Sequence, residues 1–352
     1  MSAAFAACGH TVTLHAKHGR VADDIHALYG TSGTFSLALH KNLPIPKLGV
    51  MTYALAAAFA CRFGKTLPQL AYGRDPFSIL AAAMLGVPVA LELHSIPEKP
   101  MWIQAIHALL RSSRMNGLVT ITRSLRDDVA LMFFQDSDSI LVAPDAADDP
   151  YAGSLPPPSP AAGSPMRVGY VGSLYRGRGI ELILALAERC PGMEFVIVGG
   201  QDHELEALRR KSNTANVRHV SYVPHAQLGS YYKDFDVMLA PYERAVAVAG
   251  NRGDTSKHMS PMKIFEYMSY GKPIVATKHD VLQEIQELET FCFSSELEDI
   301  EQWVACLNTL AHDPALRARM GRQAYSVFLR HYTWKTRADN ILEWLKHRAC
   351  KA

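Results

Sequence analysis

The sequence predicts an α/β fold divided between two domains, each built on parallel strands covered by helices. Short apolar segments with the length of strands alternate with longer helical segments along the chain, which is typical of parallel sheets covered on both faces. The 352 residues, of which 48% are apolar, are enough for two hydrophobic cores. A stretch rich in Pro, Ala, Gly and Ser within residues 145–165 separates two series of elements and is interpreted as a linker.

The first series contains five apolar segments that predict strands and three segments that predict helices. The strands are expected at residues 12–14, 69–72, 89–93, 118–121 and 140–142, and the helices at residues 78–85, 102–114 and 124–134. The segment 101–115 is apolar on one side and carries Arg111 and Arg114 near one end. It can pack against the core of the domain, which we favour, or lie on an anionic membrane surface.

The second series begins after the linker and ends in a helical tail that starts at Glu301. A buried strand is expected at residues 274–276, within this second series of strands and helices. The predicted organisation is an N-terminal domain, a linker, a C-terminal domain and a last helix, which occupy residues 1–150, 151–165, 166–330 and 331–352.

The most informative stretch is residues 258–280, which predicts a polar turn, a short helix and a buried strand. Ser260 is expected as the N-cap and Pro261 as the first helical residue, which leaves backbone N–H groups available to an anion. Lys263 and Glu266 are three residues apart and therefore share a helix face. The alternative to a role in binding is that the two side chains form a solvent-exposed ion pair of an ordinary amphipathic helix. Gly271 is expected to end the helix.

A second candidate for anion binding is the loop GSLYRGRG at residues 172–179. Its glycines, Gly172 and Gly177 among them, allow a phosphate to approach the backbone, and Arg176 and Arg178 supply positive charge. The alternative interpretation of the two arginines is an ordinary solvated basic loop.

These motifs resemble a known family. The run SPMKIFEYMSYGKPIVAT resembles the donor-binding signature of retaining glycosyltransferases of the family 4 type, which have the GT-B fold of two facing Rossmann-like domains. The runs VGYVGSLYRGRGIELI, FVIVG, HVSYVPH and FDVMLAPY resemble further strands and loops of that family's donor domain. The resemblance implies that residues 331–352 cross back onto the N-terminal domain. It also implies a nucleoside diphosphate sugar as substrate, with no cofactor.

The resemblance assigns roles to individual residues. Arg178 takes the place of a Lys that contacts the diphosphate, and Lys263 adds further positive potential. Ser173 stands where many members have a second basic residue, for which Arg176 is a candidate substitute. Glu266 matches the acid that binds the ribose hydroxyls. The expected donor site thus comprises Gly172, Ser173, Arg176, Arg178, Ser260, Pro261, Met262, Lys263, Ile264 and Glu266.

The N-terminal domain contributes His94, which follows the predicted strand 89–93. Clefts of open α/β sheets lie at the carboxyl ends of the strands. In the family a histidine at this place lies beside the donor sugar, so His94, Arg178 and Lys263 are the expected catalytic group. The alternative is a histidine that only caps the end of a strand.

Two departures from the family pattern stand out. The chain begins within what resembles the first helix, so the first strand of the N-terminal sheet is expected to be missing. An upstream start, a partner or another segment that supplies the edge, or a catalytically impaired chain would each account for this. The first acid of the family's glutamate pair is replaced by His258, with Asp254 as a nearby substitute.

The sequence therefore predicts a retaining hexosyltransferase-type glycosyltransferase that needs no metal ion. It would transfer a sugar from a nucleotide-sugar donor to a sugar, glycan, lipid-linked or small-molecule acceptor, as in the synthesis of cell-surface polysaccharides or glycoconjugates. One alternative is a catalytically impaired scaffold that binds nucleotide sugars or depends on a partner. A further alternative is a sugar-nucleotide epimerase.

Charge and cysteine content bear on partners and location. A formal net charge of +2 gives no indication of nucleic-acid binding. Six cysteines without metal-ligand spacing predict reduced thiols, and the N-terminus lacks the pattern of a signal peptide. We expect the cytoplasm as location, with peripheral contact at the inner face of the membrane as an open option.

Overall fold

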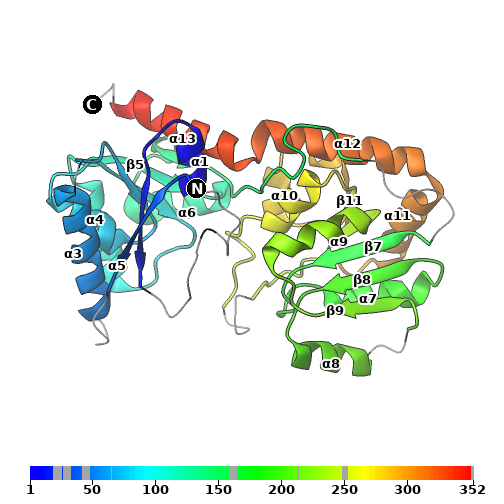
Figure 1. Ribbon diagram of the computed structural model, residues 1–352. Helices are drawn as coiled ribbons and strands as arrows, with labels where there is room; N and C mark the ends of the chain where they lie inside the picture. Colours follow the sequence, from blue (N-terminus) through cyan, green and yellow to red (C-terminus); the bar gives the residue numbers. More distant parts are fainter. Residues whose placement is uncertain are drawn as a thin grey trace. The chain divides into compact units, whose positions relative to one another are not determined.

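The computed structural model describes residues 1–18, 26, 33–41, 48–64, 66–157, 165–211, 214–247 and 253–349 (Figure 1). The chain forms two compact units. Unit 1 comprises Met1–Pro144, His258–Ser260 and Arg337–Ala352, and unit 2 comprises Asp145–Lys257 and Pro261–Thr336. The chain changes unit at Pro144, before the segment 151–165 that the sequence predicts as a linker; residues 158–164 of that segment lie outside the described residues.

Unit 1 contains two separate parallel sheets among its described residues. Strand β1 pairs with β2, and the other four strands are arranged in the order β3-β4-β5-β6. The elements in chain order are α1 (Ser2–Ala7), β1 (Thr13–Lys17), β2 (Ser36–His40), α3 (Leu48–Phe63), β3 (Ala71–Gly73), α4 (Pro76–Met84), β4 (Val89–Leu93), α5 (Pro100–Leu110), β5 (Met115–Thr120), α6 (Arg123–Phe133), β6 (Ile140–Val142) and α13 (Trp334–Ala349).

Sequence analysis missed strand β2. The segment SLALH has only five residues and its side chains are exposed or half-buried, so it lacks the continuous apolar character that indicates a buried strand. In the described part of unit 1 no strand joins β1 to β3, which leaves the sheet in the two pieces just given.

Strand β4 shows how the core of unit 1 is built. Its side chains alternate between two faces, as in any strand. Val89, Leu91 and Leu93 pack in the core cluster that also contains residues of α4, α5 and α6. Ala90 faces the other way and packs in a second cluster with Ile341 of α13. Helix α13, the C-terminal element, therefore covers one face of the four-stranded sheet.

Gly117 of β5 makes this close packing possible. A Cβ atom at this position would lie 2.3 Å from the ring of Trp344 on α13. Helix α5 is core-facing, because Ala105, Ile106 and Leu109 are buried. The packing of α5 thus supports the favoured interpretation, in which the segment 101–115 packs against the core of the domain.

Unit 2 contains one six-stranded parallel sheet in the order β12-β11-β10-β7-β8-β9 (Figure 1). Its elements are β7 (Arg167–Val171), α7 (Ile180–Arg189), β8 (Glu194–Val198), α8 (Asp202–Lys211), β9 (Val217–Val220), α9 (Leu228–Asp234), β10 (Val237–Ala240), α10 (Met262–Ser269), β11 (Ile274–Thr277), β12 (Cys292–Ser295), α11 (Ile300–His312) and α12 (Pro314–His331). The central strands β10 and β11 are buried along their whole length, as their continuous apolar runs predict.

Helix α10 begins one residue later than the sequence predicts. Pro261 is the N-cap, with φ −82° and ψ 68°, and no side chain caps the helix, so the prediction of Ser260 as N-cap is wrong. The reason is that the backbone of Pro261 does not reach helical values before Met262. The C-terminal end follows the prediction, because Gly271 has φ +62°, which glycine adopts without strain.

Across the described residues, no helix has both the length and the apolar character needed to cross a lipid bilayer.

Candidate functional site

The candidate site of unit 2 lies at the carboxyl ends of the neighbouring strands β7 and β10. The loop 172–179 follows β7, and the segment 241–247 follows β10. Two backbone hydrogen bonds join them: the N–H of Glu243 donates to the carbonyl of Gly177 at 3.0 Å, and the N–H of Ala247 donates to the carbonyl of Arg176 at 3.0 Å. Because parallel strands end at the same edge, both segments contribute to one surface.

Glycine is required where the loop presses against this segment. Gly177 has φ +89°, and a Cβ there would lie 2.1 Å from the carbonyl oxygen of Ala245. Gly179, the N-cap of α7, has φ +66°, and its Cβ would lie 1.9 Å from the carbonyl oxygen of Pro241. Both positions combine a left-handed backbone with contact to another backbone, which only glycine allows.

Lys263 enters the same surface from the first turn of α10. Its Nζ donates to the hydroxyl of Tyr170 at 2.6 Å and lies 4.0 Å from the centre of that ring. The Tyr170 hydroxyl in turn donates to the carbonyl of Ser173 at 2.7 Å. A Cβ on Gly172 would lie 2.4 Å from Cε of Lys263, so the lysine stem passes directly over this glycine.

Arg178 and Lys263 both lie near the ring of Tyr242. Cζ of Arg178 is 5.8 Å from the ring centre of Tyr242, and Nζ of Lys263 is 5.5 Å from that centre. We call Arg178, Lys263, Tyr170 and Tyr242 the cation cluster. Neither cation of the cluster forms an ion pair with a carboxylate of the described residues, and Nε of Arg178 is buried without a hydrogen-bond partner there.

The surroundings of the cation cluster disfavour the charged form of Lys263. Burial, and after it the charge of Arg178, lowers the pKa of Lys263 well below its ordinary value, although Glu266 opposes the shift. Burial also raises the pKa of Tyr170, so its phenol remains protonated at neutral pH and donates as described. Bringing an anion to the cluster would relieve both the repulsion and the unpaired donor.

Glu266 lies on the same helix but makes different contacts. Oε2 accepts a hydrogen bond from the hydroxyl of Tyr232 at 2.7 Å, and Oε1 lies 3.4 Å from Nε2 of His225. The hydrogen bond with Glu266 raises the pKa of His225, while burial opposes the shift. Because a carboxylate offers about four acceptor positions, Glu266 retains capacity for further donors such as two adjacent hydroxyls. The exposed Lys263–Glu266 pair considered from the sequence is not formed.

The other predicted donor-site residues differ in what they offer. Arg176 is exposed, Ser173 uses its carbonyl to accept from Tyr170, and Met262 is 43% exposed. The backbone N–H of Ile264 donates to the carbonyl of Pro261 at 2.9 Å, so this amide is not available to a ligand. Pro261 has no N–H, and Ser260 is grouped with unit 1.

His94 follows β4 in unit 1 and lies at the carboxyl end of that strand. Its Nε2 hydrogen-bonds Oε1 of the buried Glu92, and its side chain is 25% exposed. It is therefore tied to a carboxylate as well as placed at a strand end.

The two residues considered for the missing first acid have structural contacts. Nε2 of His258 lies 2.7 Å from Oδ2 of Asp128, in unit 1. Asp254, in unit 2, accepts from the backbone N–H groups of Val246 at 2.8 Å and Ser256 at 2.9 Å. Asp254 thus closes a turn of its own segment with Oδ1.

The sequence did not predict several side chains that contact Lys263, Arg178 or Glu266 in unit 2. Tyr170 is a buried strand residue in the run VGYVG, and Tyr232 lies in α9; neither belongs to a recognisable polar motif. Tyr242 and His225 fall inside the runs FDVMLAPY and HVSYVPH, where only the resemblance would have singled them out.

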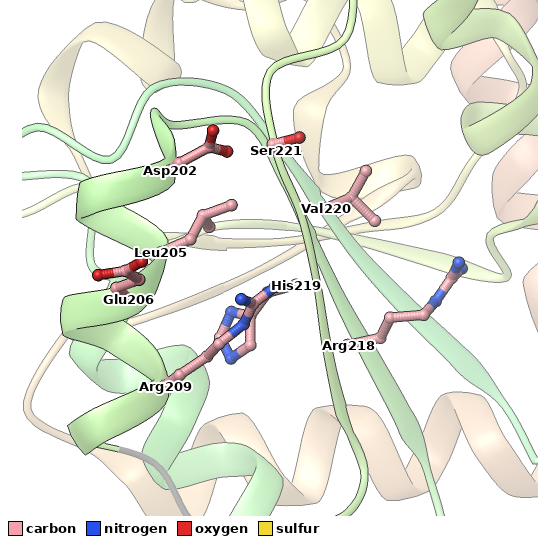
Figure 2. Close-up of a pocket in the computed structure, with 8 residues that line it drawn as sticks. All are labelled: Asp202, Leu205, Glu206, Arg209, Arg218, His219, Val220 and Ser221. Carbon is pink, nitrogen blue, oxygen red and sulfur yellow. The ribbon is translucent and has the colours of Figure 1, made fainter.

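A separate cavity of about 550 Å³ lies between helix α8 and the edge strand β9 (Figure 2). Its lining mixes two acidic with three basic side chains, and no residue of the cation cluster belongs to it. The lining residues are Asp202, Leu205, Glu206, Arg209, Arg218, His219, Val220 and Ser221. Arg209 and His219 lie side by side in Figure 2, and burial together with the charge of Arg209 lowers the pKa of His219. The mixed charge does not favour one class of ligand.

Comparison with known proteins defines the class. Residues 176–343, which include Arg178, Lys263 and Glu266, match the model of the family described as glycosyl transferase-like. This part of the chain is therefore similar to glycosyl transferase-like domains, and the predicted GT-B fold is confirmed by the solved structures that follow. None of the curated proteins searched with the sequence gives a match.

Solved structures agree with the fold. A sucrose-phosphate synthase from Thermosynechococcus elongatus matches with TM-score 0.68 and 16% identity, over 100% of this chain and 92% of that chain. A glycosyltransferase from Rickettsia africae matches with TM-score 0.73 and 12% identity, over 100% and 94%. Anabaena HepE in complex with UDP matches with TM-score 0.66 and 14% identity, over 89% and 87%.

Proposed function

We propose that this glycosyltransferase moves a sugar from a nucleoside diphosphate sugar to a sugar, glycan or lipid-linked acceptor, with retention of configuration and without a metal ion. The cation cluster is the observation that carries the proposal. Arg178 and Lys263 converge on Tyr242 without a carboxylate partner in the described residues, beside a glycine loop and the first turn of a helix. A diphosphate provides the charge that such a cluster lacks.

The proposed chemistry follows from where negative charge develops. When the bond between the sugar and the diphosphate breaks, charge builds on the leaving phosphate, and Arg178 and Lys263 stabilise it there. Glu266 accepts hydrogen bonds from both ribose hydroxyls and so fixes the nucleotide. We propose a same-face displacement in which a phosphate oxygen takes the proton of the acceptor hydroxyl, so no side chain acts as nucleophile.

Similar structures support a nucleotide donor. HepE has been solved with UDP and with UDP-glucose, and a further match is the lipopolysaccharide outer core galactosyltransferase WaaB, with TM-score 0.63 and 15% identity. These ligands make UDP and UDP-hexoses the first probes for this chain.

Substitution of Glu266 tests the proposal. Glu266→Ala removes acceptors for two hydroxyls, so the affinity for the nucleoside diphosphate that the wild type binds best should fall by about 1–3 kcal/mol, or roughly 5-fold to 150-fold. Isothermal titration calorimetry with a panel of nucleoside diphosphates measures this. Glu289→Ala, which removes an exposed carboxylate of the same unit, is the matched control and should leave affinity unchanged. Equal affinity of Glu266→Ala and wild type would remove Glu266 from the site.

Assays with labelled nucleotide sugars separate the remaining options. Transfer to an acceptor, or slow hydrolysis of the donor, supports the proposed activity. Tight nucleotide binding without either reaction would identify the chain as a scaffold, and release of an epimerised nucleotide sugar would identify an epimerase.

We propose the cytoplasm as the place of reaction, at the inner face of the membrane if the acceptor is lipid-linked. The five cysteines of the described residues are all free thiols, which supports a reducing compartment. Fractionation of cells that express the tagged chain tests this, and recovery from an oxidising compartment would contradict it.

A further inference from the structure

Helix α3 of unit 1 places large apolar side chains on its outer face. Its inner face is built from small residues: Ala54, Ala57 and Ala58 are buried, and Ala58 packs in the core cluster with residues of α4, α5 and α6. The outer side chains recur every four residues and are 42–64% exposed; they are Met51, Leu55, Phe59 and Phe63. We call these four residues the α3 stripe. A surface helix normally buries its large apolar side chains, so this reversed arrangement indicates that a further surface covers α3.

The exposed apolar surface continues from the C-terminal end of α3 onto α4. The two helices lie side by side (Figure 1), and Nε of Arg62 on α3 donates to the carbonyl of Leu85, the C-cap of α4, at 3.1 Å. Met84, which precedes Leu85, is 80% exposed. The rings of Phe59 and Phe63 stack on each other with their centres 5.5 Å apart. These apolar groups therefore extend over two neighbouring helices rather than standing singly.

The area of this face approaches what a specific interface requires. Aromatic side chains bury roughly 150–250 Å² each, so the partly exposed Phe59 and Phe63 together offer on the order of 200 Å². With Met51, Leu55 and Met84 the face offers on the order of 500 Å², a large part of the ~800 Å² that each partner of a standard interface buries. Contiguous apolar patches of this size mark interaction sites.

Charge decides between the possible occupants of this face. Among the 16 residues of α3 only Arg62 is charged. A helix that lies on an anionic membrane needs a polar face with several basic residues, which the sequence of α3 does not contain. Arg62 is also engaged, because it bonds the carbonyl of Leu85 and its Cζ lies 5.2 Å from the ring centre of Phe63. In a symmetric dimer any charge on the face would meet the same charge of the second copy, and the α3 stripe contains none.

The spacing of the α3 stripe also suits a second copy of itself. Side chains four residues apart form a ridge along a helix, and two such ridges interdigitate when the helices cross at about −50°. Ala56 and Ala60 follow Leu55 and Phe59 in sequence and leave grooves beside the ridge, because their side chains end at Cβ. One face therefore supplies both ridge and groove, as the isologous interface of a two-fold dimer requires.

We propose that this chain forms a two-fold dimer in which the α3 stripes of two copies pack against each other, with Phe59 near the centre of the interface. The inference concerns unit 1 alone and is independent of the proposed function.

Sedimentation velocity of the full chain over a concentration series tests the proposal. The wild type should change from one to two chain masses as its concentration rises. Phe59→Glu, which introduces a charge at the centre of the stripe, should raise the dissociation constant at least about 30-fold, the loss expected for a hot-spot residue. Leu131→Glu is the matched control, because Leu131 on α6 of the same unit is 77% exposed, and it should leave the dissociation constant unchanged.

Further variants separate loss of contact from loss of folding. An equimolar mixture of Phe59→Glu and Phe59→Lys should associate more tightly than either variant alone, because opposite charges then meet across the two-fold axis. Leu55→Ala combined with Phe63→Ala, which keeps the helical propensity of α3, should weaken the dimer without introducing a charge. Equal association of the mixture and of the single variants would overturn the proposal.

Two other outcomes would overturn the proposed dimer. A wild type that stays monomeric at every concentration has no such interface, and flotation of this monomer with vesicles of phosphatidylcholine and phosphatidylglycerol, lost in Phe59→Glu, would assign the α3 stripe to a lipid surface instead. A wild-type dimer that Phe59→Glu leaves intact would place the interface elsewhere. None of these measurements involves nucleotide binding or sugar transfer, so failure of the proposed function would leave them unaffected.

Discussion

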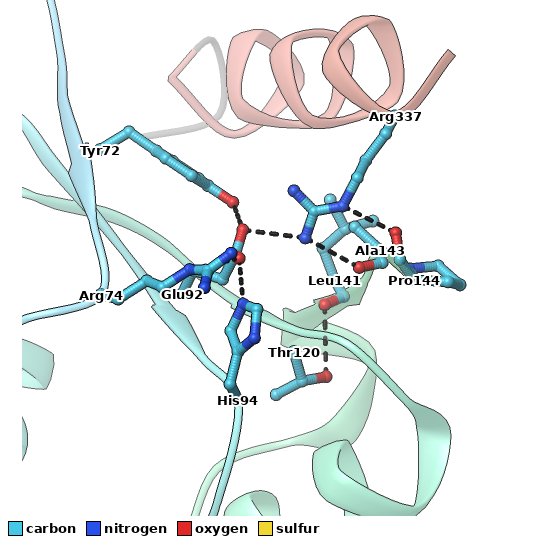
Figure 3. A network of polar contacts seen from close by, with 9 residues as sticks. All are labelled: Tyr72, Arg74, Glu92, His94, Thr120, Leu141, Ala143, Pro144 and Arg337. Carbon is cyan, nitrogen blue, oxygen red and sulfur yellow. Dashed lines mark hydrogen bonds and ion pairs between the residues drawn. The ribbon is translucent and has the colours of Figure 1, made fainter. Parts of the chain in front are cut away.

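Replacing Arg337 of α13 with Met tests how much its buried ion pair with Glu92 of β4 contributes to stability. Nη2 of Arg337 lies 3.0 Å from Oε2 of Glu92 (Figure 3). The variant keeps most of the side-chain volume but leaves Glu92, 1% exposed, without its buried cation. Breaking a buried ion pair in this way costs about 3–5 kcal/mol, because the remaining carboxylate must either stay buried without a buried cation, with the exposed Arg74 as its nearest arginine, or take up a proton. For a unit of this size the melting temperature should fall by about 6–20 °C.

Differential scanning calorimetry measures the effect, and a double variant supplies the control. Glu92→Gln combined with Arg337→Met removes both charges and should recover most of the loss, since neutral replacement of a buried pair is often tolerated. If the double variant is destabilised as much as the sum of the two single variants, the side chains do not interact and the account is refuted.

The pH dependence gives an independent check on the same pair. The pKa of Glu92 is lowered in the folded state, so the pair contributes stability that is fully present above the unfolded pKa of a Glu and lost as the pH falls through the folded pKa. The difference in unfolding free energy between the wild type and Arg337→Met should therefore shrink as the pH is lowered into the acid range. A constant difference would show that the lost stability is not electrostatic.

Two further predictions concern unit 2. The pKa of Lys263 lies well below its ordinary value in the free protein, and a bound diphosphate favours the protonated form, so nucleoside diphosphate binding should weaken with rising pH and take up protons. Calorimetry in buffers of different ionisation enthalpy measures the proton uptake. Lys263→Arg, which stays charged, should abolish this uptake, and uptake that persists in the variant would assign it to another group. Gly177→Ala should destabilise the protein more than Gly153→Ala. Both glycines have similar φ values (+89° and +84°), and the backbone strain of an alanine at such a φ costs about 1–2 kcal/mol, but only the Gly177 Cβ meets a backbone oxygen, that of Ala245 at 2.1 Å. Equal melting temperatures of the two variants would show that the loop moves away without cost.

The sequence predicted those parts of the fold that local patterns determine. The apolar run of β4, the helix and strand around Gly271, and the alternation of strands and helices in both halves all follow from residues close in the chain. The N-terminal end of α10 was misplaced by one residue because capping preference does not report the backbone angles of Pro261.

The sites could be predicted only where chemistry and sequence spacing coincide. Lys263 and Glu266 were found because they are three residues apart on a helix. The partner of Lys263 was missed because Tyr170 is 93 residues away in an apolar strand, where its hydroxyl gives no signal. Glu92 was missed because it lies inside a buried strand, and its partner Arg337 is 245 residues distant. Such pairs form only when tertiary packing brings the elements together.

A crystal structure with a bound nucleoside diphosphate tests the central claim most directly. We expect diphosphate oxygens within hydrogen-bond distance of Nζ of Lys263 and the guanidinium of Arg178, and both ribose hydroxyls on the carboxylate of Glu266. A nucleotide bound in the cavity between α8 and β9, or one whose phosphates leave Lys263 and Arg178 uncontacted, would contradict the account.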